Sequence, residues 1–508
     1  MLRWIRTWLR ASPGTETSRL IVGSTGSGKS EGELVDLVRL AERRDCAVVL
    51  LDGHGPLALR TAGHWIPRGH EARLVYEPLD ATDRVLCWDM LPRSYAANPS
   101  RRLLEDAETR DELAQCFLAQ RNLATAADRP LTREWLEAAI TLCLGQPGPQ
   151  PLPSLLSAFR VGSPAYGRLL RDCTDPAVVD KFRELERVHR RSAVQYEIQT
   201  GASRRLLEAV CSSEVVRLRS RPGPFDWLQA VRERKLIAFD GGGIRSREIR
   251  RTLFLLVSMQ VIHAVRRHFA ETQRPLPVVL VLEEAGVLGL VTPFVSMALQ
   301  ELRKAGLSVH LITQSSLDFG DQAVFEGLLA NTPWQAWYQC LSPADQEIGA
   351  RALANATFSP HAVHFTRPRQ VRDGVEPVAT ETRGESLDAH GHVRGHDTRT
   401  GSALVPRFRE TDEAYYKSPS LHEQEYRTRL ATLRIGERIV RDRTGVRRER
   451  VKLLRPPRRQ HRFGDATREA IERIRRQPIY LPPAPTPPDA SAAVPHDAAA
   501  RLRSERAE

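Results

Sequence analysis

The sequence has 508 residues, of which 41% are hydrophobic and 27% charged, and its formal net charge is +13. This composition is that of an ordinary globular chain of about three domains, and it excludes a collagen-like, wholly disordered or polytopic membrane protein. No apolar run reaches the roughly eighteen residues of a membrane-spanning helix, and the seven cysteines include no CxxC pair, so neither a zinc site nor a disulfide framework is expected.

The first hundred residues carry the pattern of an α/β unit. Residues 1–18 form an entry segment without the apolar centre of a signal peptide, suited to packing on the next domain or to resting on a membrane surface. Short apolar runs at 18–22, 47–51 and 74–76 predict buried strands, and the spacing of 30–41 predicts a helix. Continuous apolar strands alternating with helices indicate a mostly parallel sheet that is covered on both faces, here in a core part spanning 19–100.

A helical block interrupts this core. Strand signals vanish over 101–220, where we expect an all-α insertion with helices at 102–119, 132–144 and 176–188. The core resumes over 221–365, with four strands and two helices. The expected strands are 235–239, 278–282, 307–313 and 334–339, and the expected helices are 246–269 and 294–304.

The C-terminal third is polar and basic. We expect a polar loop over 366–406, a basic segment over 407–455 that contains a hairpin at 437–454, and a Pro-rich disordered tail over 456–508. Residues 434–462 hold twelve Arg or Lys and three acidic residues, a net charge of +9. Such a stretch predicts a polyanionic partner, with nucleic acid as the first candidate and an anionic membrane as the second.

The most specific motif follows the first strand. Its eight residues fit GxxxxGK[ST]: Gly23, Ser24, Thr25, Gly26, Ser27, Gly28, Lys29 and Ser30. Glycines let backbone N–H groups converge on phosphate oxygens, and the following helix adds the positive end of its dipole. We therefore predict an ATP site in which Lys29 reaches the β- and γ-phosphates and Ser30 binds Mg²⁺.

Three other positions complete the expected catalytic set. The strand 278–282 ends in Glu283, expected to hold Mg²⁺, and Glu284, expected to orient or deprotonate the attacking water. Gln314 ends the strand 307–313, where its amide can contact the γ-phosphate or the water. Arg303 is a candidate arginine finger for a neighbouring subunit, with a plain surface arginine as the alternative.

The triple glycine at 241–243 is followed by a cluster of four arginines that could line a pore and grip DNA phosphates, or could simply begin a solvated helix: Arg245, Arg247, Arg250 and Arg251.

The order of these motifs resembles the HerA/FtsK group of motor ATPases, and most closely soluble relatives of the TraG/TraD-type coupling proteins of conjugative type IV secretion. The resemblance rests on the P-loop, VLLDGHG (49–55), LVLEEAG (280–286), ELRKAGLSVHLITQS (301–315) and a weaker echo at LRIGERIV (433–440). It implies a P-loop NTPase (RecA-like) core, with an inserted all-α domain and a basic, partly disordered C-terminal tail. It also implies a homo-hexameric ring with ATP between subunits and DNA at the pore.

The function that the resemblance implies is an ATP-hydrolysing DNA translocase of conjugative transfer, with relaxosome or secretion-channel proteins as partners. The expected location is the cytoplasm, or the periphery of the inner membrane. One alternative is a HerA-like DNA pump that works with a separate nuclease in end processing or defence. The other is an ATP-gated adaptor with little turnover.

Overall fold

The computed structural model describes residues 17–94, 98–118, 130–320, 322–359, 363–387, 391, 393–416, 418–452, 454 and 460–482. The chain divides into two units, residues 1–348 with 430–508 and residues 349–429. Two helices cross the boundary between the units, α15 (Pro343–Thr357) and α16 (Pro419–Thr432). None of the helices within these ranges has both the length and the apolar composition that crossing a bilayer requires.

A nine-stranded sheet organises the first unit. Its strand order is β12-β11-β8-β1-β7-β6-β2-β5-β3, with all strands parallel except β11 and β12. The strands are β1 (Arg19–Val22), β2 (Ala47–Asp52), β3 (Leu74–Pro78), β5 (Leu236–Asp240), β6 (Val278–Leu282), β7 (Leu307–Thr313), β8 (Trp334–Trp337), β11 (Glu437–Asp442) and β12 (Gly445–Arg450). All seven strands predicted for the core are confirmed, and the basic hairpin is β11–β12.

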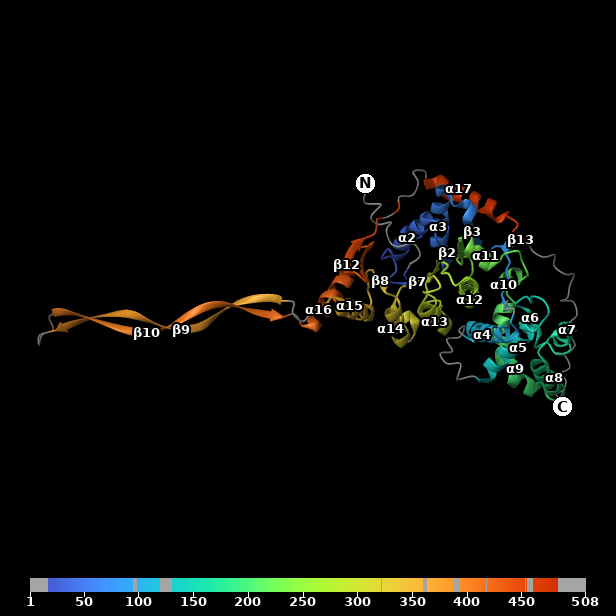
Figure 1. Cartoon of the computed structure of the whole chain (residues 1–508), viewed down its shortest axis with the longest axis horizontal. Coiled ribbons are helices and arrows are strands. Elements are labelled where there is room, and N and C mark those ends of the chain that lie inside the picture. The colour runs from blue at the N-terminus through green and yellow to red at the C-terminus, as the bar shows by residue number, and fades with distance from the viewer. Residues whose placement is uncertain are drawn as a thin grey trace, which may run out of the picture. The chain divides into compact units, whose positions relative to one another are not determined.

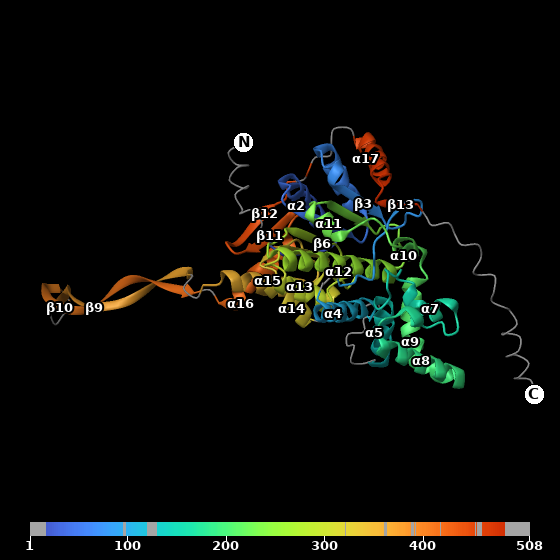
Figure 2. The same ribbon diagram turned by 45° about the vertical axis from the view of Figure 1, so that its right-hand side comes forward.

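Helices cover both faces of this sheet, as continuous apolar strands require. Helices α2 (Lys29–Arg43), α3 (Pro56–Trp65) and α17 (Gln460–Arg475) lie on one side, and α12 (Arg247–Thr272) and α13 (Pro293–Glu301) lie on the other (Figures 1 and 2). Helix α11 (Trp227–Arg232) packs on α12, and α14 (Gln322–Asn331) packs on α13. Ser246 caps the long helix α12, since its hydroxyl accepts from the backbone N–H of Ile249.

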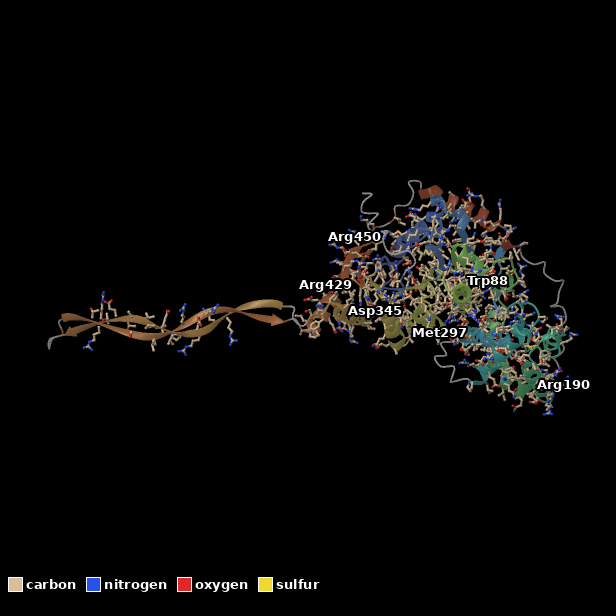
Figure 3. The ribbon with its side chains drawn as sticks, viewed as in Figure 1. Trp88, Arg190, Met297, Asp345, Arg429 and Arg450 are labelled. Atoms are coloured by element: carbon tan, nitrogen blue, oxygen red, sulfur yellow. The ribbon has the colours of Figure 1, made fainter. Side chains whose placement is uncertain are left out.

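Only helices lie in the described residues between β4 (Val85–Leu86) and β5. They are α4 (Pro99–Leu118), α5 (Pro130–Leu144), α6 (Ser154–Ser157), α7 (Pro164–Asp172), α8 (Pro176–Arg191), α9 (Ala193–Cys211) and α10 (Glu214–Arg219), followed by α11. The Asp175 side chain caps α8 at two backbone N–H groups, and Pro176 follows it at the first helical position. In Figure 3, Arg190 of α8 lies at the outer end of this helical block, whereas Trp88 lies inside the molecule, where it is fully buried.

The expected polar loop 366–406 is wrong. Residues 366–387 and 393–406 belong to a long antiparallel pair in the second unit, β9 (Val363–Leu387) and β10 (Val393–Tyr416), while 388–390 and 392 lie outside the described residues. Exposed Val, Thr and Arg side chains lie on both faces of this pair, so the sequence lacks the apolar alternation that predicts a strand. The strands are defined by the backbone hydrogen bonds between them.

The expected disordered tail 456–508 is also wrong over 460–482, while residues 456–459 and 483–508 lie outside the described residues. Helix α17 buries one side through Thr467, Ala470, Ile471 and Ile474, and β13 (Tyr480–Leu481) pairs with β4. The hydroxyl of Tyr480 accepts from the N–H of Tyr76 and donates to its carbonyl, both at 2.9 Å, on the edge strand β3. Because prolines flank this segment on both sides, its sequence suggested disorder. Its amphipathic helix is buried by contacts with α3 and β3, which are distant in the sequence.

Candidate nucleotide site

The P-loop connects β1 to α2 at the carboxyl edge of the parallel strands. Gly26 and Gly28 have φ of 77° and 98°, in the left-handed region that favours glycine, and Gly28 is the N-cap of α2. A Cβ atom added to Gly26 would meet nothing within 4 Å, so this side of the loop is open. The loop and the N-terminus of the helix together form the phosphate cradle that the motif predicts.

Lys29 is buried within this loop. Its ammonium donates to the carbonyl oxygens of Gly23 and Ser24, the latter at 3.0 Å. Burial lowers the pKa of Lys29, although the nearby carboxylates of Glu284 and Glu283 act against that change. The two loop carbonyls therefore hold a cation at the point where phosphates are expected.

Ser30 and Glu283 meet as predicted. The Ser30 hydroxyl donates to Glu283 Oε1 at 2.9 Å, and Glu283 Oε2 is buried without a partner. A hydroxyl and a carboxylate are oxygen ligands of the kind that Mg²⁺ prefers, and the unpartnered oxygen leaves capacity for a cation. The residues thus fit the magnesium site assigned to them.

Asp52 is a third buried carboxylate at this point, and sequence reasoning did not assign it a role. It accepts from the backbone N–H groups of His54 at 2.9 Å and Ala58 at 2.8 Å, near the start of α3. Burial, and after it the neighbouring Asp52 carboxylate, together raise the pKa of Glu283 to about 10. Its position in the sequence could have identified it: Asp52 ends a buried strand, and the carboxyl ends of parallel strands, including the one before the P-loop, lie at the same edge of the sheet.

Glu284 lies beside this group in an unusual backbone conformation. Its φ is 58°, which is uncommon for a residue other than glycine and marks local strain. Gln314 Nε2 donates to Glu284 Oε1 at 2.7 Å, and the Thr25 hydroxyl donates to Gln314 Oε1 at 2.7 Å. A continuous chain of side chains therefore links the P-loop, the tip of β7 and the tip of β6.

One oxygen of Glu284 remains available for chemistry. Oε2 is buried without a partner, while the imidazole Nε2 of His54 lies 3.7 Å from Oε1. A fixed carboxylate with one unpartnered oxygen next to a phosphate cradle has the arrangement of a group that orients water. His54 is a further neighbour of the site that the sequence did not single out.

Arg303 lies apart from these residues. It is exposed in the turn that precedes β7, whereas the P-loop follows the carboxyl end of the parallel strand β1. The seven residues of β7 span about 20 Å, so Arg303 lies at the opposite edge of the sheet from the nucleotide site of its own chain. Its role as a finger for a neighbouring subunit stays a prediction.

The arginines at the start of α12 hold loops in place. Arg247 donates to the carbonyl of Val287, Arg250 to that of Gly53 at 2.5 Å, and Arg251 to that of Gly289 at 3.2 Å. Arg251 is buried, and burial lowers its pKa to about 10, so it is not a phosphate contact. Within this cluster only Arg245 and Arg247 are exposed.

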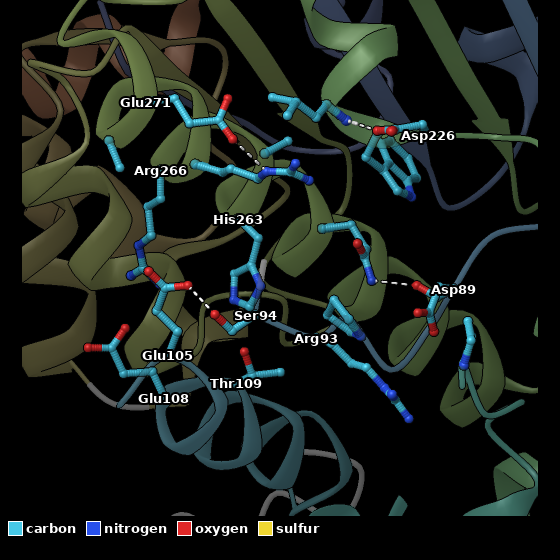
Figure 4. Close-up of a pocket in the computed structure, with 18 of the residues that line it drawn as sticks. Asp89, Arg93, Ser94, Glu105, Glu108, Thr109, Asp226, His263, Arg266 and Glu271 are labelled. Carbon is cyan, nitrogen blue, oxygen red and sulfur yellow. Dashed lines mark hydrogen bonds and ion pairs between the residues drawn. The ribbon is translucent and has the colours of Figure 1, made fainter. Parts of the chain in front are cut away.

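A second concave region lies away from the P-loop. A cleft of about 850 Å³ runs between α4 of the helical block and α11 and α12 of the core (Figure 4). Ion pairs and hydrogen bonds tie its walls together: Glu112 contacts His263 at 2.5 Å and Arg266 at 2.7 Å, and Gln260 donates to the carbonyl of Asp89 at 2.7 Å. These contacts make the cleft a joint between the helical block and the core.

The basic segment contributes an exposed edge. Strand β12 is the free edge of the sheet, and Arg443, Arg447, Arg448 and Arg450 on or beside it are exposed. Arg450 marks this edge in Figure 3. Arg447 and Arg448 also pair with acidic neighbours, Asp442 and Glu437 respectively.

Comparison with solved structures finds coupling proteins of bacterial conjugation. Bacterial conjugative coupling protein TrwBdeltaN70 in complex with sulphate aligns with a TM-score of 0.50 and 14% identity, over 92% of this chain and 89% of that chain. Plasmid coupling protein TrwB in complex with ADP and Mg²⁺ aligns with a TM-score of 0.50 and 13% identity, over 93% and 90% of the two chains.

No protein-family model matches the sequence, and no curated protein matches it significantly. The structural likeness, at this level of identity, concerns the fold. It confirms the expected resemblance at that level: the chain has the P-loop ATPase fold seen in conjugative coupling proteins.

Proposed function

We propose that this protein is an ATP-hydrolysing motor that moves DNA, in the manner of a conjugative coupling protein. The observation that carries the proposal is the arrangement at the carboxyl edge of the sheet. There the P-loop, the Ser30–Glu283 pair and the Thr25–Gln314–Glu284 chain converge. A binding module needs only the P-loop, whereas hydrolysis also needs a positioned carboxylate and a group that senses the γ-phosphate.

Each residue has a defined task in this proposal. Lys29 leaves the carbonyls of Gly23 and Ser24 and neutralises the β- and γ-phosphates. Ser30 and Glu283 would hold Mg²⁺, which when bound would supply positive charge to neutralise the phosphates. Glu284 orients the attacking water and takes its proton. Gln314 holds the Glu284 carboxylate in place and links it to Thr25 in the P-loop.

The same structure offers a route from hydrolysis to movement. Arg247 and Arg251 tie the start of α12 to the carbonyls of Val287 and Gly289, in the loop that follows Glu284. Further along α12, His263 and Arg266 contact Glu112 of the helical block. A conformational change in the loop after Glu284 would therefore be transmitted through α12 to the contacts between the core and the helical block.

DNA and a ring assembly belong to this proposal as well. The exposed arginines of β12 offer sequence-independent phosphate contacts, for which affinity falls steeply with salt. The TrwB structures with ADP and Mg²⁺, and with an ATP analogue, support the assignment of nucleotide and metal.

The test is steady-state ATP hydrolysis by the full chain, with and without single-stranded or duplex DNA. The motor proposal expects turnover that DNA stimulates and that Lys29→Ala abolishes. Tight ATP binding without turnover under any DNA condition, in protein whose assembly has been verified by mass photometry, would replace the motor by the ATP-gated adaptor.

A further inference from the structure

Two large apolar side chains are exposed next to the P-loop. Ile435 is 71% exposed and Leu341 is 65% exposed, although nearly all other apolar side chains of the surrounding strands are buried. Single exposed apolar residues are common on protein surfaces. Two that both lie beside the same glycine-rich loop call for a specific explanation.

Hydrogen bonds hold both residues against the loop. The N–H of Leu341 donates to the Ser24 hydroxyl at 2.9 Å, and the N–H of Gly436, next to Ile435, donates to the carbonyl of Ser27 at 3.0 Å. A Cβ atom added to Gly28 would lie 2.9 Å from the nitrogen of Gly436 and 3.9 Å from Ile435 Cγ2. Ile435 is therefore in near contact with the last glycine of the cradle.

The turn that carries Ile435 is rigid. The Glu437 carboxylate accepts from the N–H of Arg434 at 3.0 Å, and the N–H of Glu437 donates back to the carbonyl of Arg434 at 2.9 Å. The N–H of Val451 also donates to the carbonyl of Gly436 at 2.9 Å. The backbone that carries Ile435 is thus held next to the P-loop by contacts within the protein.

The order of the strands gives the direction of a bound nucleotide. Strand β1, which leads into the P-loop, has β7 and then β6 on one side and β8 and then β11 on the other. Gln314 and Glu284 follow β7 and β6, so the γ-phosphate faces that side. The nucleoside end then points toward β8 and β11. Leu341 is exposed just after β8, and Ile435 is exposed just before β11.

We propose that Ile435 and Leu341 form the nucleobase subsite, in which the flat apolar face of the base covers their side chains. This inference rests on the proposed nucleotide site and adds the residues that bind the base. Aliphatic side chains recognise the face of a ring rather than its hydrogen-bonding edge, so the subsite strengthens binding without selecting one purine by polar contacts.

The test separates the base from the phosphates. Dissociation constants of the full chain for ATP and for inorganic tripolyphosphate, both with Mg²⁺, are measured by displacement of a ribose-labelled fluorescent ATP. Ile435→Ser should weaken ATP binding about tenfold and leave tripolyphosphate binding within about twofold, because only the base loses apolar contact. Leu341→Ser should act in the same direction, by about threefold.

The matched control is Val194→Ser on α9, which removes an apolar side chain that is 69% exposed, far along the chain from the loop. It should change neither constant. Equal weakening of ATP and tripolyphosphate by Ile435→Ser would overturn the inference, since the turn would then support the P-loop or a subunit contact. Unchanged ATP affinity in both variants would overturn it too. Wild-type protein that binds no ATP would overturn this inference together with the proposed function.

Discussion

The nucleotide edge of the sheet and the cleft beside α12 are both rich in charged side chains, yet they differ in how those charges are satisfied. At the nucleotide edge, Glu283 and Glu284 each keep one buried oxygen without a partner. At the cleft, both oxygens of Glu112 have hydrogen-bond partners, His263 and Arg266, and Glu105 contacts Ser94 and Arg101.

This difference distinguishes a ligand site from a joint. A buried oxygen without a partner carries a desolvation cost that only a ligand can remove, whereas a fully paired charge already has its partner within the fold. The cleft is a concavity of about 850 Å³, but the unpartnered carboxylate oxygens lie at the nucleotide edge. Four variants test this distinction, beginning with the largest expected effect.

Lys29→Ala removes the only lysine of the P-loop. ATP hydrolysis should fall by about 10³-fold or more, because the charge that forms on the phosphates loses its main counter-charge. Phosphate release with and without DNA measures the effect. Lys181→Ala on α8, which breaks a surface pair with Glu134, is the matched control and should keep normal turnover. Substantial hydrolysis by Lys29→Ala would contradict the assigned site.

Glu284→Gln keeps the size of the side chain and removes its basicity. Turnover should fall by about 10² to 10³-fold, while the dissociation constant for ATP changes by less than about threefold. Single-turnover hydrolysis and equilibrium binding measure the two quantities. Glu301→Gln, at the exposed end of α13, serves as control. Loss of ATP binding together with turnover would make Glu284 a structural residue instead.

Gln314→Ala cuts the chain between Thr25 and Glu284. Turnover should fall by about tenfold, since Glu284 keeps its basicity but loses its orientation. Thr25→Val breaks the same chain from the other end. The double variant should lose little more than either single variant, because both remove one interaction. Fully additive losses would show that Gln314 and Thr25 act separately.

Glu112→Gln weakens the joint and should have the smallest effect on catalysis, with turnover within about twofold of wild type. Replacing one partner of a buried pair should cost about 2 kcal/mol of unfolding free energy, or a few degrees in melting temperature. Glu108→Gln, exposed on the same helix, is the control. A variant with normal stability but strongly reduced turnover would make the cleft part of the catalytic apparatus.

The pH dependence of that stability difference follows from the pKa of Glu112. Burial alone would raise this pKa, but His263 and Arg266 outweigh burial and hold it below its usual value of 4.5. The stabilisation is therefore complete above about pH 4.5 and lost as the pH falls through the folded-state pKa. The melting difference between wild type and Glu112→Gln should shrink as the pH falls below 4.5. A difference that persists or grows well below pH 4.5 would contradict the assigned contacts of Glu112.

Much of the fold was predictable because the core strands are short apolar runs that need no context to be identified. The runs at 278–282 and 307–313 coincide with β6 and β7, residue for residue. The P-loop was predictable for a similar reason, since its glycines and its lysine act through backbone geometry and local spacing. Glu283 and Glu284 followed from their place at the end of a buried strand.

The sequence by itself thus determined the α/β class, the P-loop and the order of the motifs, because each depends on local spacing. Only the tertiary structure decided which distant side chains meet: Asp52 beside Glu283, Thr25 with Gln314, and Ile435 against Gly28. It also decided that β9 and β10 pair into a ribbon where a loop was expected, and that residues 460–481 pack within the first unit. The physical reason is that such contacts depend on strand order and burial, which join residues hundreds of positions apart and leave no periodic trace in the chain.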